Sequence, residues 1–508
     1  MTGSICEPQT EVVLPLAPLR PTEHRRRRAH LVGVCGSGMQ GLARLLWDWG
    51  WELSGSDARP PTPAIAALMQ AGFRFYHPQA PTAWSDPADL LIYSPAVGAD
   101  HPERMAARRN GILECSYPQM LGRIMRDRRG VSIAGTHGKS TTTAMTASIL
   151  RDAGRQPSAI FGSELIEGGV SSWSGTGDLF VVESCEFARG FWELSPRYAA
   201  ILSVEPDHFD CFATTAELVD AFAGFAARVD RAGLLLARHD DPLAMEASRA
   251  CPADVLTFGW SEEADWWAGD LRRTAVGTRF RLFRRGQYIT EVQLSVPGRH
   301  NVLNAVAAAA LASELGVSAA AIRGSLQEFA GIRRRFERLG SWRGVTLVDD
   351  YAHHPTAVEA TLQTAREMYG RRRLVCAFQP HQVSRTRALL AEFARSFRLA
   401  DRVWVVPVFA AREQVTNEPA ELARRLTDQI AQEGPPAEFA SSLDQLVRAL
   451  EDGLRPGDVL LTLGAGDVDR VHHAFTRRIL RNSAAGRTVG PVHVVEGGRA
   501  RAILPHSA

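Results

Sequence analysis

The stretch that decides the fold reads Val131-Ser132-Ile133-Ala134-Gly135-Thr136-His137-Gly138-Lys139-Ser140-Thr141. Its first part is a short β-branched run that predicts a buried strand, and the pattern after it predicts a helix that ends near Gly154. A strand, a glycine-rich turn and a helix N-terminus can together hold a polyphosphate, because the exposed N–H groups and the helix dipole favour anions. The sequence therefore predicts that residues 135–141 bind ATP or GTP.

Two side chains of this turn have specific expected roles. Lys139 would reach the outer phosphates, and the Ser140 hydroxyl would bind Mg²⁺. The loop is shorter than that of the common nucleotide triphosphatases, since only two residues separate Gly135 from Gly138. A chance glycine-rich turn is the less favoured alternative, because Gly-Lys-Ser-Thr falls directly between the predicted strand and helix.

The composition bounds the class of protein. At 508 residues the chain is too long for one core and is expected to form about three units. It is 45% hydrophobic with a net charge of +2, which predicts a globular protein and gives no electrostatic reason to expect a nucleic acid or membrane partner. Seven scattered cysteines without a C-x-x-C pattern indicate reduced thiols rather than a disulfide frame or a zinc site. We find no signal peptide and no apolar run of about 18 residues, and expect a soluble cytoplasmic protein.

A second glycine-rich turn follows a predicted strand near residue 30. Another strand ends at Asp57, which is the layout of a dinucleotide-type fold, where glycines admit a diphosphate and an acidic residue binds a ribose hydroxyl. The glycine spacing departs from G-x-G-x-x-G, so we expect a nucleotide diphosphate other than NAD, with a purely structural turn as the alternative. The candidate contacts are Gly36, Ser37, Gly38, Met39, Asp57 and Ser94.

Polar residues also follow the strands after the phosphate loop. Glu183 ends the strand 179–182 and is a candidate metal ligand, because carboxyl ends of parallel strands line the ligand crevice and Mg²⁺ prefers oxygen. His208 is either a ligand or a structural histidine, since imidazole suits Mg²⁺ poorly. Asn301 and Asn304 share a helix face and either contact adenine or cap the helix. Residues 230–295 have a weak pattern and are expected to form an irregular flank.

The last third of the chain alternates strands with helices, which predicts another parallel sheet. Its strands are expected at 345–348, 374–378, 403–408 and 459–463. Polar side chains follow the strand ends more often than folding alone requires. They include Asp350, Tyr351, His353, His381 and Arg385, and Arg335 lies at the hinge into this region.

These motifs together resemble the Mur ligases, the ATP-dependent amide-forming enzymes of peptidoglycan precursor synthesis. The likeness covers roughly residues 30–475 and several independent motifs in the family's order. They are Gly33–Ala43 with Gly55–Asp57, Gly135–Thr141, Glu183, Asp207-His208, Gly298–Asn304, Arg334–Phe336, Asp349–Pro355 and Phe378–His381.

The resemblance implies an α/β fold of three domains. These are a Rossmann-like N-terminal domain for a UDP-sugar at 29–127, a central P-loop ATPase-type parallel sheet domain for ATP at 128–333, and a C-terminal Rossmann-like domain for an amino acid at 334–480. Flexible tails are expected at 1–28 and 481–508.

The resemblance also implies a reaction. The carboxylate of UDP-N-acetylmuramate would attack the γ-phosphate of ATP, and the amine of L-alanine would then attack the acyl phosphate and release phosphate. The segment Phe378–Thr386 favours L-alanine over a murein tripeptide, and a degenerate nucleotide-binding regulatory protein is a further alternative. We expect ATP and Mg²⁺ as cofactors, no nucleic acid, no membrane insertion, and a monomer or homodimer.

The site residues that the resemblance implies form four sets. The catalytic set is Lys139, Glu183, His208 and Arg335, and the metal set is Ser140, Glu183 and His208. ATP would contact residues 135–141, Asn301, Asn304, Arg335, Asp350 and His353, while L-alanine would contact Tyr351, His381 and Arg385. Cys185 and Gln382 stand where the family commonly has Asp and Arg, and Gln382 leaves a preference for alanine, glycine or serine open.

Overall fold

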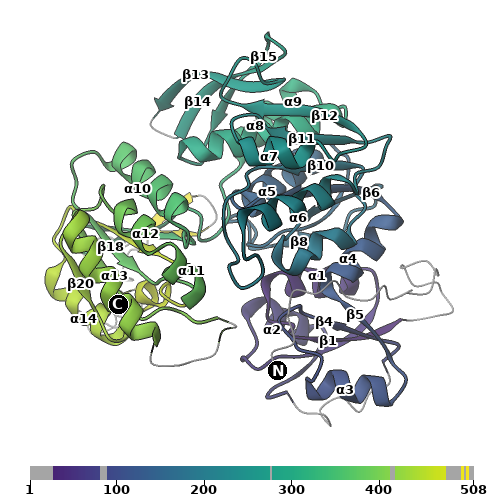
Figure 1. Cartoon of the computed structure of the whole chain (residues 1–508), viewed down its shortest axis with the longest axis horizontal. Coiled ribbons are helices and arrows are strands. Elements are labelled where there is room, and N and C mark those ends of the chain that lie inside the picture. The colour runs from purple at the N-terminus through teal and green to yellow at the C-terminus, as the bar shows by residue number, and fades with distance from the viewer. Residues whose placement is uncertain are drawn as a thin grey trace.

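The computed structural model describes residues 27–79, 88–274, 277–411, 413 and 418–475, and the backbone of 493–496 and 499–502. In this part of the chain, three larger sheets follow one another in sequence, each covered by helices (Figure 1). The α/β fold of three domains predicted from the sequence is confirmed. Most of both predicted tails lies outside the described residues, apart from the antiparallel pair β22 (His493–Glu496) and β23 (Arg499–Ala502).

The first sheet has the strand order β3-β2-β1-β4-β5 and is parallel throughout. The order reverses beside β1, and sheets of this kind bind ligands at the carboxyl ends of the strands beside such a reversal, which is where the glycine turn lies. The strands are β1 (Arg28–Val32), β2 (Glu52–Ser56), β3 (Arg74–Tyr76), β4 (Leu90–Tyr93) and β5 (Leu113–Ser116). The helices are α1 (Ser37–Asp48), α2 (Pro63–Gln70), α3 (Pro102–Arg109) and α4 (Tyr117–Arg126).

The central sheet has the order β15-β14-β13-β12-β11-β10-β6-β9-β7-β8. The prediction of an irregular flank at 230–295 is wrong, because long antiparallel strands extend the sheet there. The strands are β6 (Arg129–Ala134), β7 (Ser158–Ile160), β8 (Ser172–Trp173), β9 (Leu179–Glu183), β10 (Tyr198–Ile201), β11 (Leu234–Arg238), β12 (Asp254–Gly259), β13 (Trp266–Thr274), β14 (Gly277–Arg284) and β15 (Gln287–Leu294).

Helices cover this sheet and carry part of the site. They are α5 (Lys139–Asp152), α6 (Thr215–Ala226), α7 (Pro242–Ser248), α8 (Arg299–Glu314), α9 (Ala319–Glu328) and the 3₁₀ helix η1 (Phe187–Glu193). Helix α8 is buried along almost its whole length and packs on α5. Its run of alanines lets the two helices approach closely, which brings the start of α8 beside the phosphate loop.

The third sheet has the order β16-β17-β21-β18-β19-β20 and is parallel except for β16, as the sequence predicted for its core. The strands are β16 (Glu337–Trp342), β17 (Val345–Asp350), β18 (Leu374–Phe378), β19 (Arg402–Val405), β20 (Ala437–Phe439) and β21 (Val459–Leu463). The helices are α10 (Pro355–Tyr369), α11 (Val383–Ala388), α12 (Leu390–Ser396), α13 (Glu418–Glu433) and α14 (Leu443–Gly453).

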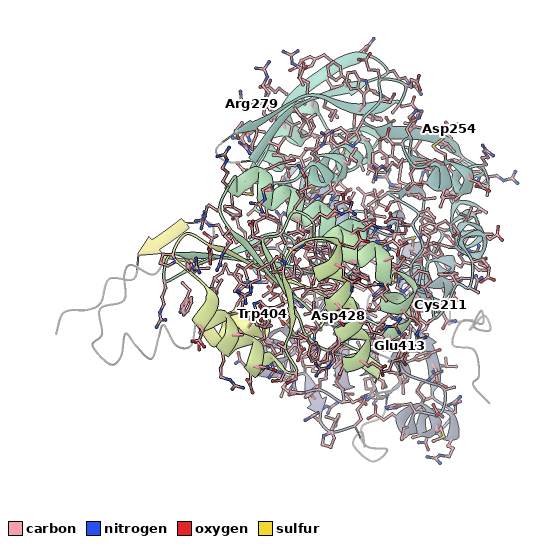
Figure 2. The ribbon with its side chains drawn as sticks, turned by 60° about the vertical axis from the view of Figure 1, so that its left-hand side comes forward. Cys211, Asp254, Arg279, Trp404, Glu413 and Asp428 are labelled. Carbon is pink, nitrogen blue, oxygen red and sulfur yellow. The ribbon has the colours of Figure 1, made fainter. Side chains whose placement is uncertain are left out.

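The structure also bears on the expected state of the cysteines and on membrane insertion. The prediction of reduced thiols is confirmed for Cys35, Cys115, Cys185, Cys251 and Cys376 and is wrong for Cys211, labelled in Figure 2, which is disulfide-bonded. Within the described ranges, no helix combines the length and apolar character needed to cross a membrane.

Candidate active site

One cavity of about 320 Å³ brings most of the predicted site residues together. The central domain contributes the loop after β6, the ends of β9 and β10, and the start of α8, while the third domain contributes the loops beside β17. The predicted residues that line the cavity are Thr136, His137, Gly138, Lys139, Ser140, Thr141, Glu183, His208, Asn301, Asn304, Arg335, Asp350, Tyr351 and His353.

The phosphate loop is held in a tight turn by two glycines. Gly135 and Gly138 have φ values of 140° and 81°, and a Cβ atom on Gly138 would lie 2.4 Å from Asn304 Oδ1. Gly138 is also the N-cap of α5 and provides no side-chain hydrogen bond to the first turn. The N–H groups at this end of the helix therefore face the cavity side of the loop, where they suit an anion.

Lys139 is the only lysine in a sequence with 58 lysines and arginines in total. Its Nζ lies 3.0 Å from the Glu186 carboxylate, and His208 Nε2 lies 3.3 Å from the same group. Burial opposes the charge of Lys139, yet the nearby carboxylates, chiefly Glu186, raise its pKa above the usual value. The ammonium therefore stays protonated in the cavity.

Glu186 is a site residue that the sequence analysis missed. Burial alone would raise its pKa, but Lys139 and His208 lower the pKa of Glu186 to about 2. The signal was a second carboxylate three residues beyond Glu183, just past the same strand. The structure places His208 on this carboxylate rather than on Glu183.

Ser140 and Glu183 face each other, as expected for a shared metal. Ser140 Oγ donates to Glu183 Oε2 at 2.8 Å, and the Gly162 N–H donates to the same oxygen at 2.7 Å. A Cβ atom on Gly162 would lie 2.6 Å from Glu183 Oε2 and 2.9 Å from Ser140 Oγ. The two oxygens therefore border a small cradle that glycine keeps open.

The start of α8 adds amides and an unforeseen histidine. Asn304 Nδ2 donates to Asn301 Oδ1 at 3.1 Å, and Asn301 Nδ2 donates to the Pro297 carbonyl at 2.6 Å. The capping alternative is wrong, because Gly298 is the N-cap of α8 and no side chain caps it. His300 also lines the cavity, and burial, with the positive charge of Arg335, lowers its pKa to about 4. His300 is therefore neutral at pH 7.

In the third domain, Asp350 shapes the loops that reach the cavity. Its carboxylate accepts the N–H of Phe336 at 2.7 Å and that of Ala352 at 2.8 Å. Burial raises the pKa of Asp350 to about 6, against the lowering effect of Arg335 and these N–H groups. The guanidinium of Arg335 lies 4.9 Å from the centre of the Tyr351 ring. Asp350 thus holds in place the segments that carry Arg335 and Tyr351.

The predicted amino-acid set lies together beside the cavity, but Arg385 is paired. Arg385 Nε donates to Asp207 Oδ1 at 2.6 Å, and Arg385 Nη1 donates to the His381 carbonyl at 3.0 Å. Burial opposes the charge on Asp207, yet Arg385 holds the pKa of that carboxyl well below its usual value. The His353 ring lies 5.6 Å from that of His381 and 5.1 Å from that of Tyr351. Asp207, from the central domain, was missed as the partner of Arg385.

The predicted UDP site surrounds the first glycine turn. Gly36 is the N-cap of α1, and a Cβ atom on Gly38 would lie 2.8 Å from the Tyr117 ring. Asp57 supports the turn itself, since its two oxygens accept the N–H groups of Cys35 and Arg59 at 2.8 and 2.9 Å. The remaining members lie at the same edge of the sheet: Ser37 and Met39 begin α1, and Ser94 follows β4.

The comparisons with known proteins follow the same division of the chain. The Mur ligase family catalytic domain matches residues 28–129, the Mur ligase middle domain matches 133–312, and the Mur ligase glutamate ligase domain matches 334–466. The chain belongs to the Mur ligase family.

Within that family, two curated relatives carry the same name. The chain is 39% identical over 443 residues to UDP-N-acetylmuramate–L-alanine ligase of Desulfitobacterium hafniense (strain Y51), covering 87% of this chain and 98% of the relative. It is 36% identical over 448 residues to the enzyme of that name in Alkaliphilus metalliredigens (strain QYMF), covering 88% and 96%. The crystal structure of UDP-N-acetylmuramate-alanine ligase from Thermotoga maritima matches with a TM-score of 0.76 at 28% identity, covering 90% of this chain and 99% of that one. A murein peptide ligase from Psychrobacter arcticus shares the fold, with a TM-score of 0.70 at 24% identity and coverage of 91% and 100%.

Proposed function

We propose that this protein joins L-alanine to the carboxylate of UDP-N-acetylmuramate in peptidoglycan precursor synthesis, with ATP converted to ADP and phosphate. The observation that carries this proposal is the cavity between the central and third domains, which is lined by Lys139 of the phosphate loop together with Arg335 and Tyr351. The names of the relatives support the choice of substrates within the family. The reaction takes place in the cytoplasm. The protein acts as a monomer or a homodimer and has no nucleic-acid partner.

In the first step, an oxygen of the muramate carboxylate attacks the γ-phosphorus of ATP, and the bond to the β–γ bridging oxygen breaks. ADP leaves with the electron pair of that bond, and an acyl phosphate forms. The N–H groups at the start of α5 cradle the phosphates, and Lys139 and Arg335 neutralise the charge on the transferring group. Asn301 and Asn304 contact the adenine side, while Asp350 and His353 close over the nucleotide from the third domain.

A magnesium ion fits the cradle beside Gly162. Ser140 and Glu183 offer hard oxygen ligands there, and a side chain at Gly162 would fill the space. His208 would support this site through Glu186 or hold a second ion. When bound, Mg²⁺ would neutralise negative charge on the ATP phosphates.

In the second step, the amine of L-alanine attacks the acyl carbon, and the tetrahedral intermediate collapses with loss of phosphate. Tyr351, His381 and Arg385 form the alanine pocket, with Arg385 oriented for the alanine carboxylate by Asp207. The UDP diphosphate lies at the first glycine turn, on Gly36, Ser37, Gly38 and Met39, with Asp57 and Ser94 at its sides. Each domain has one of these tasks: residues 29–127 bind the UDP-sugar, residues 128–333 bind ATP, and residues 334–480 bind the amino acid.

The test is phosphate release by the purified chain with ATP, Mg²⁺ and UDP-N-acetylmuramate. L-alanine, glycine, L-serine and the murein tripeptide are supplied in separate reactions, with Lys139→Ala as the control. Release that depends on L-alanine and not on tripeptide is expected. Release with tripeptide alone would identify a recycling ligase, and no release with any acceptor would favour a degenerate nucleotide-binding protein.

A further inference from the structure

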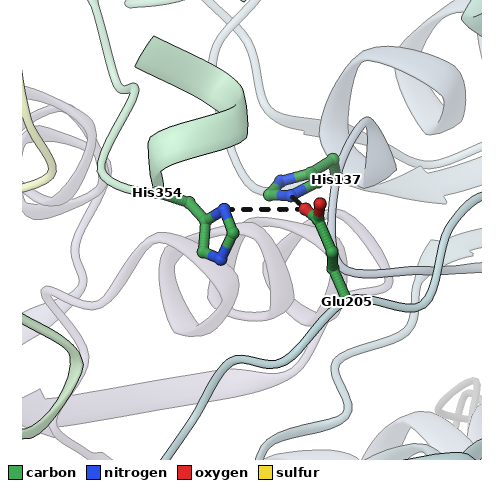
Figure 3. Close-up of side chains that lie close together, drawn as sticks. All are labelled: His137, Glu205 and His354. Carbon is green, nitrogen blue, oxygen red and sulfur yellow. Dashed lines mark hydrogen bonds and ion pairs between the residues drawn. The ribbon is translucent and has the colours of Figure 1, made fainter. Parts of the chain in front are cut away.

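Three metal-ligating side chains meet at the border of the central and third domains (Figure 3). His137 lies in the phosphate loop, Glu205 follows β10, and His354 directly precedes α10. Their ligand atoms all lie within 4.8 Å of one another. Glu205 Oε2 is 2.5 Å from His137 Nε2 and 3.6 Å from His354 Nδ1. His137 belongs to the expected ATP-binding loop, but neither the family motifs nor the proposed reaction gives the three side chains a joint role.

The tautomer of His354 is fixed by its second nitrogen. Nε2 lies 3.2 Å from the Pro206 carbonyl, which can only accept a hydrogen bond, so Nε2 carries the proton. Burial, with the neighbouring His137 ring, lowers the pKa of His354 to about 4. The ring is therefore neutral at pH 7, and Nδ1 presents a lone pair. This Nδ1 is buried and makes no hydrogen bond.

The carboxylate that faces this lone pair is an anion. Burial alone would raise the pKa of Glu205, but its hydrogen bond to His137 and the neighbouring His354 and Thr356 lower it to about 2. The second oxygen, Oε1, accepts from the Thr356 hydroxyl at 2.8 Å. A lone pair and a carboxylate oxygen that point at each other across 3.6 Å repel unless a cation lies between them.

We propose that His137, Glu205 and His354 bind a transition-metal ion of the Zn²⁺ class, which ties the phosphate loop to the start of α10. Two imidazoles and one carboxylate suit Zn²⁺, whereas Mg²⁺ prefers oxygen ligands throughout. Bonds of about 2.0–2.1 Å in a tetrahedral site place ligand atoms roughly 3.3 Å apart. The pair Glu205 and His354 already has nearly this spacing. For His137 Nε2 to bind the ion, the proton that it shares with Glu205 is released to solvent, and the ring moves away from Glu205 by less than about 1 Å.

The surrounding hydrogen bonds match those of a metal site. The Pro206 carbonyl orients His354, and Thr356 orients Glu205, as outer partners commonly do for metal ligands. Because the ligands come from both domains, the bound ion stabilises the closed arrangement of the two domains. The fourth position stays available to water or to a phosphate oxygen in the cavity.

The test is titration calorimetry of the full-length, chelator-treated protein with ZnCl₂ in excess MgCl₂. One Zn²⁺ per chain is expected, with affinity reduced about 100-fold or more in Glu205→Gln and in His354→Gln, and about tenfold in Thr356→Val. His239→Gln is the matched control, because His239 lies 3.6 Å from Glu263 in another histidine–glutamate pair of the central domain. Cooperative thermal unfolding confirms that each variant is folded.

Cobalt distinguishes this site from the second cluster of possible ligands, Cys185, Glu186 and His208. Co²⁺ at the proposed site should give visible bands without a thiolate charge-transfer band, and Cys185→Ser should leave them unchanged. The proposal is overturned if the chain binds no Zn²⁺ stoichiometrically in excess Mg²⁺. It is equally overturned if binding survives Glu205→Gln and His354→Gln, or is lost in Cys185→Ser.

Discussion

The chain forms a strand, a glycine turn and a helix twice, after β1 in the first domain and after β6 in the central domain. Both helices begin at a glycine N-cap without a side-chain cap, Gly36 in one and Gly138 in the other. The surroundings differ. Lys139, Glu183 and Glu186 border the central turn, whereas the acidic residue of the first turn, Asp57, bonds to backbone N–H groups.

The difference shows that backbone geometry supplies anion binding and side chains supply chemistry. Both turns offer free N–H groups and a helix dipole to a phosphate. Only the central turn combines them with an ammonium, a paired carboxylate and an oxygen cradle among the described residues. The first turn is therefore suited to hold a diphosphate that does not react, and the central turn to transfer a phosphoryl group.

Loss of Lys139 should have the largest effect. Lys139→Ala is expected to lower kcat for phosphate release about 1000-fold, because a preorganised charge at the transferring group is lost. Lys139→Arg should recover little of this, since a planar guanidinium does not replace a compact ammonium in so confined a loop. Phosphate release at saturating substrates measures both.

The matched control lies at the first turn. Arg59→Ala removes a cation that is largely exposed beside Asp57 and should leave kcat within about twofold of wild type. A Lys139→Ala enzyme with more than a tenth of the wild-type kcat would contradict the division of roles between the two turns.

Glu186→Gln should change how stability depends on pH. The folded pKa of about 2 lies below the ordinary value of 4.5, so the carboxylate contributes stability above pH 4.5 that is lost as the pH falls towards 2. The shift corresponds to roughly 3 kcal/mol. Urea unfolding between pH 5 and 2 should therefore show a steeper loss for wild type than for the variant. Parallel curves for the two proteins would contradict the pairing of Glu186 with Lys139 and His208. Glu205 also has a lowered pKa, but it is present in both proteins and contributes equally to both curves.

The sequence predicted features that are local along the chain. Glycine turns, β-branched runs and helix periodicity identified both turns, the third sheet and the residues at strand ends. The same signals singled out Ser140 and Glu183, which lie at the ends of their elements and are within hydrogen-bond distance of each other. Long antiparallel strands at 266–294 escaped notice, because their outer faces carry polar residues and blur the hydrophobic pattern.

Pairings between distant segments could not be predicted. Arg385 meets Asp207 across 178 positions of sequence, and His354 meets Glu205 across the same domain border. Whether a charged residue at a strand end faces a ligand or another residue depends on how the domains dock. Glu186 and His300 were missed for the same reason, since their neighbours come from other elements.

Replacing a glycine of either turn by alanine should weaken binding only of the substrate that this turn holds. Gly138→Ala places a Cβ in a left-handed conformation, at a cost of about 1–2 kcal/mol, and against Asn304. It should raise KM for ATP about tenfold and leave KM for UDP-N-acetylmuramate near wild type. In Gly38→Ala the added Cβ meets the Tyr117 ring. This variant should raise KM for UDP-N-acetylmuramate and leave KM for ATP near wild type. Substrate titrations of both variants test this, and an equal change in both KM values would remove the distinction.

Asp57→Asn should have the smallest effect and sharpens the comparison most. The amide keeps an oxygen for one backbone N–H but loses the charge on its hydrogen bonds to Cys35 and Arg59, a loss of about 1 kcal/mol. Because Asp57 acts on the shape of the turn, KM for UDP-N-acetylmuramate should rise about fivefold with kcat unchanged. A fall in kcat without a change in KM would mean that Asp57 acts on the reacting groups, and the first turn could then no longer be regarded as a passive diphosphate site.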